Sequence, residues 1–247
     1  CLMRIVSLVP SWTEYLLDIE AHVVGRTKFC VRPDDNVKHI ENIGGTKSIK
    51  PSRIADLKPD LIIANLEEND REQVEACQAF CTVLLTDVRT VESAWNEAKR
   101  IALAVGKPEA GELWVRRIQE AWGTKRPIHS KAAYVVWKAP LMIAGSDTYI
   151  SDVMRWWGIE NVGGQWTEGR YPQPDSQEWL ETKADWIMLP TEPFPFKEKH
   201  LSEFSANIGA PILVDGEAFS WYGSRMLHAT DYFKALVHTL KQTHTEN

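Results

Sequence analysis

Residues 91–122 read VESAWNEAKRIALAVGKPEAGELWVRRIQEAW, and this stretch decides the fold. Its apolar residues recur at the three-and-four spacing of a helix face until Gly106 interrupts them; they are Trp95, Ala98, Ile101, Ala102 and Val105. Pro108 suits a first helical turn, and the same spacing then restarts with Ala110, Trp114, Ile118 and Ala121. The pattern predicts a second helix from about Pro108 to Trp122, roughly 20 Å long. It fits either a spine between two lobes or an ordinary helix inside one domain.

The composition is that of a globular protein without an electrostatic attraction to nucleic acid. The chain has 247 residues, of which 25% are charged and 44% hydrophobic, enough for one large domain or two small ones. The net charge of -6 gives no long-range attraction to nucleic acid or anionic lipid, so we expect no nucleic-acid partner. Eleven tryptophans is a high number, and they must either fill cores or face a flat ligand.

The compartment is left open by the sequence. No run approaches the roughly 18 apolar residues of a membrane span. Cys1 fits a mature lipoprotein terminus, and Met3 fits equally well as a native start. Cys77 and Cys81 lie four apart on a predicted helix, too far for an unstrained disulfide, and we expect all four cysteines to be free thiols. That expectation favours a cytosolic protein slightly.

Short apolar runs alternate with helical segments on both sides of the central stretch. We predict strands before it at residues 4–10, 23–25, 60–65 and 81–85, and strands after it at residues 132–137, 185–190 and 212–214. A closing helix is predicted over residues 225–240. Setting Asp60 on Asp185 also places Lys58 on Lys183 and Glu67 on Glu192, which indicates a weak internal repeat. The alternation predicts two α/β lobes with parallel sheets.

Ligands of parallel sheets bind beyond the carboxyl ends of the strands, so the segments there are the candidate site. They are residues 10–12, 65–69, 137–140, 190–196 and 215–225. Five irregularly placed aromatic residues fall in or beside them, namely Trp12, Trp137, Phe194, Trp221 and Tyr222. This concentration is the strongest functional indication from spacing alone.

Four segments carry a resemblance to a known family. RIVSLVPSWTEYL (4–16), PSRIADLKPDLIIA (51–64), the 91–122 stretch and GRYPQPDSQEWLETKADWIML (169–189) are similar to the helical-backbone class (class III) of periplasmic substrate-binding proteins. The similarity is best to the branch that binds vitamin B12 and iron complexes. It implies two Rossmann-like lobes joined by a long backbone helix, with the N-terminal lobe at 3–105, the helical linker at 106–127 and the C-terminal lobe at 128–247. It also implies a ligand in the cleft between the lobes and delivery to a membrane transporter.

The chain departs from that branch in two respects. Vitamin B12-binding members usually place a Trp at the end of the second N-lobe strand and another in the loop before it, where this chain has Asn65 and the Thr46-Lys47 turn. Members dock to the transporter through one exposed Glu per lobe. Glu72 lies within a residue of the first such position, and the second has no secure match.

We take eleven residues as candidates for ligand binding, although each has a structural alternative. The aromatic side chains would line a flat cleft or seal the cores of the lobes. Lys47 and Arg225 would bind polar groups of the ligand or be solvated. The three acidic residues would accept hydrogen bonds, bind a cation or dock onto arginines of a partner. The set is Trp12, Lys47, Glu67, Glu68, Trp137, Tyr171, Glu192, Phe194, Trp221, Tyr222 and Arg225.

Catalytic and metal-binding residues are not predicted. Paired carboxylates could divide acid and base roles, but no nucleophile motif, Walker loop or Gly-rich fingerprint accompanies them. No pair among the seven His has a ligand spacing such as HxxxH. His200 or His228 could still give a haem an axial ligand.

The sequence therefore predicts a non-enzymatic, monomeric binding protein without a built-in cofactor. Its predicted ligand is a cobalamin-like corrinoid, bound in the cleft for uptake through an ABC transporter permease, in the periplasm or at a membrane anchor. Haem or a ferric siderophore is the alternative ligand, although a siderophore favours a basic cleft. A cytoplasmic enzyme or corrinoid-handling protein on the same scaffold is the alternative class.

Overall fold

The computed structural model describes residues 2–167, 169–204 and 207–245. The chain divides into two compact units. Unit 1 comprises Cys1–Val88, Glu92–Trp122 and Trp221–His228, and unit 2 comprises Arg89–Val91, Gly123–Ser220 and Ala229–Asn247. This division differs from the bounds expected from the resemblance, and Arg89–Val91 of the expected N-terminal lobe belong to unit 2. Residues 108–122 of the expected linker pack with unit 1, and residues 221–228 of the expected C-terminal lobe do so as well.

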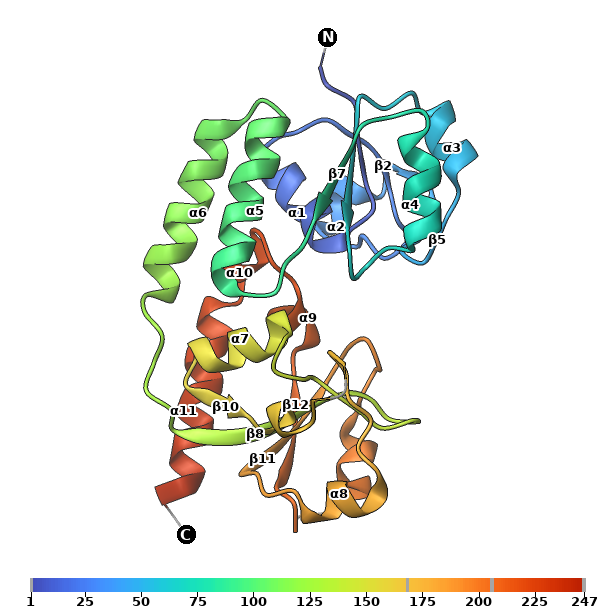
Figure 1. Cartoon of the computed structure of the whole chain (residues 1–247). Helices are drawn as coiled ribbons and strands as arrows, with labels where there is room; N and C mark the ends of the chain where they lie inside the picture. Colours follow the sequence, from blue (N-terminus) through green and yellow to red (C-terminus); the bar gives the residue numbers. More distant parts are fainter. Residues whose placement is uncertain (1, 168, 205–206, 246–247) are drawn as a thin grey trace. The chain divides into compact units, whose positions relative to one another are not determined.

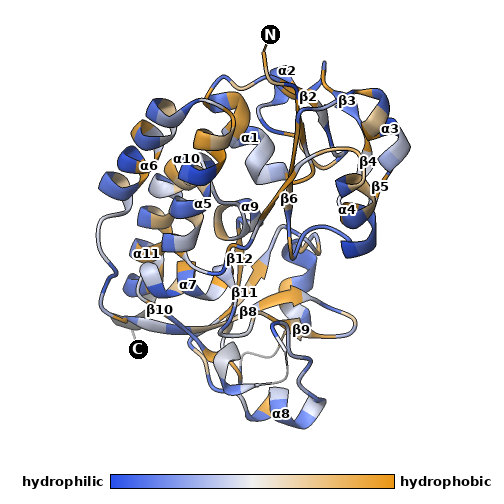
Figure 2. Ribbon diagram, turned by 45° about the horizontal axis from the view of Figure 1, so that its top comes forward, coloured by the Kyte–Doolittle hydropathy of each residue, from blue (hydrophilic) through white to orange (hydrophobic). Residues whose placement is uncertain are grey.

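Unit 1 is built on a parallel sheet in which the chain's first strand is central. The strand order is β3 (Glu41–Asn42), β2 (Val23–Arg26), β1 (Ile5–Ser7), β6 (Leu61–Asn65) and β7 (Val83–Thr86), and every pair is parallel. The helices that alternate with the strands are α1 (Pro10–Asp18), α2 (Asp34–Val37), α3 (Pro51–Asp56) and α4 (Arg71–Gln78). A small antiparallel hairpin, β4 (Gly44–Gly45) and β5 (Ser48–Ile49), follows β3. The strand β6 is buried along its whole length and appears as a hydrophobic run in Figure 2.

The 91–122 stretch forms two helices of unit 1, α5 (Val91–Ala104) and α6 (Pro108–Trp122), side by side in Figure 1. Both helices are predicted correctly, but the buried face of α6 is not. Gly111, Val115, Ile118 and Trp122 are buried, one position away from most of the expected set. The reason is Gly111, at which an added Cβ would lie 2.3 Å from the Cβ of Ala102. The missing side chain lets α6 approach α5 closely, and this contact sets the rotation of the helix.

Unit 2 contains a second parallel sheet. Its order is β10 (Ile159–Asn161), β8 (Ser130–Trp137), β11 (Trp186–Pro190) and β12 (Ala210–Val214), with β9 (Met142–Ile143) antiparallel to β8. The helices are α7 (Tyr149–Trp156), α8 (Ser176–Glu181), α9 (Gly216–Ser220) and α11 (Thr230–Thr245), with short 3-10 turns η1 (Val162–Gln165) and η2 (Glu198–Glu203). Two lobes with parallel sheets confirm the predicted α/β fold class.

The predicted closing helix is broken into α10 (Arg225–His228), which belongs to unit 1, and α11. The break has a local cause. The carbonyl oxygen of Met226 accepts a 2.7 Å hydrogen bond from the indole N–H of Trp122. In a continuous helix that carbonyl would accept from the backbone N–H four residues later. The Trp122 side chain therefore takes the place of a helical hydrogen bond and ends α10.

The internal repeat predicted from the sequence has a structural counterpart at Asp60 and Asp185. In unit 1, Asp60 Oδ2 accepts from the backbone N–H of Arg4 at 2.7 Å, and the Asp60 N–H donates to the Arg4 carbonyl. In unit 2, Asp185 Oδ2 accepts from the Lys131 N–H at 2.6 Å, and the Asp185 N–H donates to the Lys131 carbonyl. The two Asp residues thus make the same pair of contacts just before β6 and β11.

Two further expectations concern cysteines and membranes. Cys30, Cys77 and Cys81 are free, as predicted, and Cys1 lies outside the described residues. Within the described ranges, no helix combines the length and apolar character needed to cross a bilayer.

Candidate functional site

The carboxyl end of β6 in unit 1 carries a tightly bonded turn that presents Glu67 and Glu68. Asn65, the last residue of β6, accepts through Oδ1 from the backbone N–H groups of Glu67 (2.9 Å) and Glu68 (3.2 Å). Asn69 closes the turn, because its Oδ1 accepts from the Asn65 N–H at 2.9 Å. Asn side chains commonly shape turns by bonding the backbone two residues on. Asn65 therefore organises the turn that presents Glu67 and Glu68.

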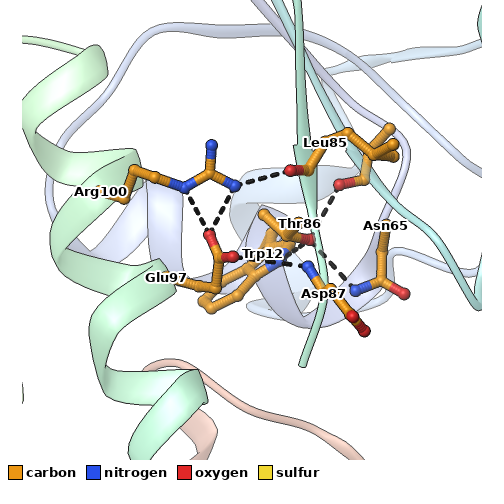
Figure 3. Close-up of polar contacts among 8 residues, drawn as sticks. Trp12, Asn65, Leu85, Thr86, Asp87, Glu97 and Arg100 are labelled. Carbon is orange, nitrogen blue, oxygen red and sulfur yellow. Dashed lines mark hydrogen bonds and ion pairs between the residues drawn. The ribbon is translucent and has the colours of Figure 1, made fainter. Parts of the chain in front are cut away.

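A buried network lies behind this turn (Figure 3). The Thr86 hydroxyl donates to the Ala64 carbonyl at 2.8 Å. It also accepts from the indole N–H of Trp12 and from the Asn65 amide, each at 3.1 Å. Both Trp12 and Thr86 are fully buried. The hydroxyl thus uses its one proton and two lone pairs.

The outer edge of β7 is covered by a pair of charged residues from α5 (Figure 3). Arg100 donates to the Leu85 carbonyl at 2.6 Å and pairs with Glu97 at 2.7 Å. Glu97 Oε1 in turn accepts from the Asp87 N–H at 3.4 Å. Edge strands left open pair readily with other chains. These contacts occupy outward backbone groups of β7 and favour a monomer at this edge.

The strand ends of unit 1 also expose apolar side chains that the sequence reasoning missed. Phe29 (50% exposed) and Val31 (46%) follow β2, and Leu66 (56%) follows β6. Lys47 Nζ donates to the Glu67 carbonyl, and the Phe29 ring lies beside Gly45, so these loops are contiguous. The available signal was a pair of apolar residues in a non-periodic strand-end loop. Phe29 and Val31 were missed because the segment after the predicted 23–25 strand was not among the candidate strand-end segments.

Four predicted binding residues lie in the packing of unit 1. Trp12 is fully buried, and its ring lies 4.5 Å from that of Tyr222, which is 5% exposed. Trp221 is 7% exposed. The Arg225 guanidinium lies 5.7 Å over its ring and pairs with Glu14, with Nε 3.0 Å from Oε2. Trp12, Trp221 and Tyr222 are thus packed in unit 1, as the sealing alternative expects, whereas Arg225 is paired with Glu14 rather than solvated. Contact of these four side chains with a ligand stays a prediction.

Glu14, Asp18 and His228 form the group of described residues that could hold a metal ion, with ligand atoms within 4.8 Å of one another. Arg225 already pairs with Glu14, and a fixed positive charge beside the group opposes a cation. The pKa of His228 is lowered, first by burial and then by Arg225 and Arg117, against the opposing effect of Asp18. The residues fit an ion-pair cluster at the α1–α10 contact better than a metal site.

His200, the other candidate axial ligand, lies inside unit 2. It is 8% exposed, and its Nδ1 accepts from the Lys197 backbone N–H at 2.9 Å. It lies in the 3-10 turn η2, and its role as an axial ligand stays a prediction. The rings of Phe194 and Phe196 lie 5.7 Å away, and this apolar packing explains the burial.

Trp137 forms an exposed aromatic surface at the end of β8 in unit 2. It is 38% exposed, and its indole N–H donates to the Ala139 carbonyl at 3.1 Å. The half-buried Phe194, at the end of β11, packs edge-on against it at 5.3 Å, and Phe194 packs on Phe196 at 4.6 Å. The indole N–H of Trp137 thus has its hydrogen-bond acceptor within the chain, and the Phe194 ring packs against the Trp137 ring. Part of Trp137 remains at the surface, which suits contact with a flat ligand.

Carboxylates accompany this aromatic surface. Glu192 accepts from the Ser220 hydroxyl at 3.2 Å, and Gly216 packs so closely that an added Cβ would lie 2.6 Å from Glu192 Cγ. Asp215 follows β12, and its N–H donates to the Tyr232 hydroxyl at 2.8 Å. Burial, followed by Glu192, raises the pKa of Tyr134 on β8 well above its usual value. Tyr171 is half-buried, and its electrostatic influence reaches Tyr134.

The site chemistry described so far suits binding rather than nucleophilic catalysis. Cys30 is buried against the hydroxyls of Thr13 (3.0 Å) and Thr27 (3.2 Å), and burial raises its thiol pKa. A raised pKa disfavours the thiolate that a cysteine nucleophile needs. The strand ends instead offer aromatic faces and hydrogen-bond acceptors, the usual lining of a small-molecule site.

Several proteins with similar sequences are named vitamin B12-binding proteins. The chain is 26% identical over 198 residues to a vitamin B12-binding protein of Photorhabdus laumondii subsp. laumondii, covering 76% of this chain and 70% of that protein. It is 23% identical to one of Pectobacterium carotovorum subsp. carotovorum, covering 92% and 85%.

Solved structures share the fold over nearly the full length. The periplasmic vitamin B12 binding protein BtuF of Vibrio cholerae superposes with a TM-score of 0.78 at 19% identity, covering 96% of this chain and 97% of that one. The periplasmic heme-binding protein BhuT, in complex with two hemes, gives 0.79 at 18% identity, with coverages of 96% and 98%. Residues 5–206 match the family described as periplasmic binding protein, and with the fold above they show that the chain belongs to that family.

Proposed function

We propose that this protein binds a large, flat, cofactor-like ligand and does not convert it chemically. A corrinoid is the ligand that we favour. The observation that carries the proposal is Trp137. It lies at a strand end, the residue is 38% exposed, and its indole N–H is already bonded within the chain. An exposed ring face of this kind gains most from another flat apolar surface.

The charges at the strand ends favour a corrinoid over haem. Glu67 and Glu68 follow β6 in unit 1, and Glu192 and Asp215 follow β11 and β12 in unit 2. Carboxylates accept hydrogen bonds from the amide groups at a corrin edge, whereas they repel the propionates of haem. Curated relatives with the name vitamin B12-binding protein point to the same ligand.

Delivery to an ABC-type transporter in the periplasm completes the proposal. Membership of the periplasmic binding protein family supports this location and partner. Glu72, the expected docking residue of the first lobe, is exposed at the start of α4 and thus accessible to a partner. The protein would act as a monomer that carries its ligand to the permease.

The proposal is tested by calorimetric titration with cyanocobalamin, with haemin in parallel. We expect one-to-one cyanocobalamin binding tighter than about 1 μM, near -8 kcal/mol, and weaker haemin binding. Trp137→Ala should raise the dissociation constant by about three- to tenfold, from the worth of one aromatic contact. Trp114→Ala, which removes a half-buried indole from α6, is the matched control. Tighter haemin than cyanocobalamin binding would reassign the ligand, and equal effects of the two variants would remove Trp137 from the site.

A further inference from the structure

The Thr86 hydroxyl has a fixed role in the polar network of unit 1. Its proton goes to the Ala64 carbonyl, which can only accept. The indole N–H of Trp12 can only donate, and so it occupies one lone pair of the hydroxyl. The Asn65 Nδ2 occupies the other. The direction of every hydrogen bond around Thr86 is therefore settled by the chemistry of its partners.

The same reasoning fixes the orientation of the Asn65 amide. The backbone N–H groups of Glu67 and Glu68 are donors, so the oxygen of the Asn65 side chain must face them. The nitrogen then faces Thr86. Asn65 is 3% exposed, which leaves water little access as a substitute partner. The orientation that shapes the turn thus depends on an acceptor that Thr86 supplies.

We propose that Thr86 is a positioning residue for ligand binding: through Asn65 it sets the backbone of the Leu66–Asn69 turn and hence the places of the Glu67 and Glu68 carboxylates. This inference rests on the proposed function, since it concerns ligand binding at the strand-end surface of unit 1. It also assigns a task to Asn65, which holds the turn through its side-chain oxygen. Rigid support of this kind reduces the ordering cost when a ligand binds.

The turn has a second anchor that Thr86 does not control. Asn69 Nδ2 donates to the carbonyls of Leu8 (3.0 Å) and Thr46 (3.1 Å). Removal of the Thr86 hydroxyl should therefore loosen the first half of the turn while the second half stays attached. The amide protons of Glu67 and Glu68 report on the first half directly, because Asn65 Oδ1 is their acceptor.

The test compares Thr86→Val with Thr86→Ser and with the control Thr82→Val. Valine keeps the shape and removes the hydroxyl, serine keeps the hydroxyl, and Thr82 is an exposed residue just before β7. Hydrogen exchange of the Glu67 and Glu68 amides is measured without ligand, and the dissociation constant for cyanocobalamin is measured separately. We expect Thr86→Val to speed exchange at both amides and to weaken binding, each by about tenfold, since one buried hydrogen bond is worth about that factor. Thr86→Ser should restore both.

Unchanged exchange in Thr86→Val would overturn the positioning role, and so would faster exchange with unchanged cyanocobalamin affinity. If the wild type binds no cyanocobalamin, the proposed function fails, whereas the exchange measurement still decides whether Thr86 holds the turn. Should Thr86→Val not fold, Asn65→Ala removes the same support without disturbing the Trp12 or Ala64 contacts of Thr86. It is expected to give the same faster exchange, and unchanged exchange there would also refute the proposal.

Discussion

Arg225→Met should be among the most damaging single changes in unit 1. The Glu14 side chain is 5% exposed and that of Arg225 is 17% exposed, so the change leaves a carboxylate buried without its partner. Breaking a buried ion pair on one side costs about 3–5 kcal/mol. Protonation of the Glu14 carboxyl sets an upper limit to the loss of unfolding free energy. Neutralising a carboxyl of ordinary pKa ~4.3 at pH 7 costs about 3.7 kcal/mol. The expected loss is therefore about 3–4 kcal/mol at pH 7.

The same argument predicts how the loss depends on pH. In Arg225→Met, the Glu14 carboxyl takes up a proton when the protein folds. Each pH unit below 7 lowers the free-energy cost of this protonation by about 1.4 kcal/mol. The variant should therefore differ from the wild type by only about 1 kcal/mol at pH 5. Urea unfolding of the ligand-free protein at the two pH values measures this difference.

Two companion variants separate the ion pair from the loss of side-chain volume. Arg116→Met, at an exposed position of α6, should change the free energy of unfolding by no more than about 0.5 kcal/mol. The double variant Glu14→Gln/Arg225→Met should recover about 2 kcal/mol, because it leaves no buried charge. A loss below about 1 kcal/mol for Arg225→Met at pH 7, or an equal loss at pH 5, would refute the reasoning.

Two other changes test local features of the structure. Gly163→Ala would place a Cβ 2.1 Å from the Ala144 carbonyl oxygen, whereas Gly164→Ala would meet Ser146 Cβ at an ordinary 3.4 Å. Thermal unfolding should show the first variant to be less stable by about 1–3 kcal/mol and the second to be near neutral; equal stabilities would contradict the close packing. The lowered pKa of His228 means that the folded state resists its protonation, so this group costs stability as pH falls below the ordinary value of about 6.5. His228→Gln should flatten the decline in the unfolding free energy between pH 7.5 and 5, and an unchanged profile would show that another group causes the decline.

Much of the fold was readable from the sequence because its signals are local. The 3.6-residue period gave α5 and α6, and short apolar runs gave the parallel strands apart from the short β3 and β10. The rotation of α6 was not readable. Gly111 does not count as an apolar residue in the periodicity that predicts a buried helix face. Its small size nevertheless lets it pack against Ala102. The end of α10 was missed for a similar reason, since it depends on the indole of the distant Trp122.

The candidate site was predicted less completely than the fold. The strand-end rule led to Trp137 and to the Glu67–Glu68 turn, which do lie at strand ends. It could not show that Arg225 is paired with Glu14, because the two are 211 positions apart and no local pattern connects them. Nor could it separate Trp12, which is buried, from Trp137, which is exposed. Burial of an aromatic residue in a strand-end segment depends on its tertiary neighbours.

The central claim is that a corrinoid binds at the strand-end surface that contains Trp137. The most direct test is an ¹⁵N spectrum of the tryptophan indoles during titration with cyanocobalamin, with the Trp137 signal assigned by Trp137→Phe. The indole N–H of Trp137 lies beside its exposed ring face and is bonded to Ala139, whereas that of Trp122 is buried and bonded to Met226. The account predicts that the Trp137 signal shifts saturably at a one-to-one ratio while the Trp122 signal stays in place. Saturable binding that leaves the Trp137 signal unmoved would contradict it.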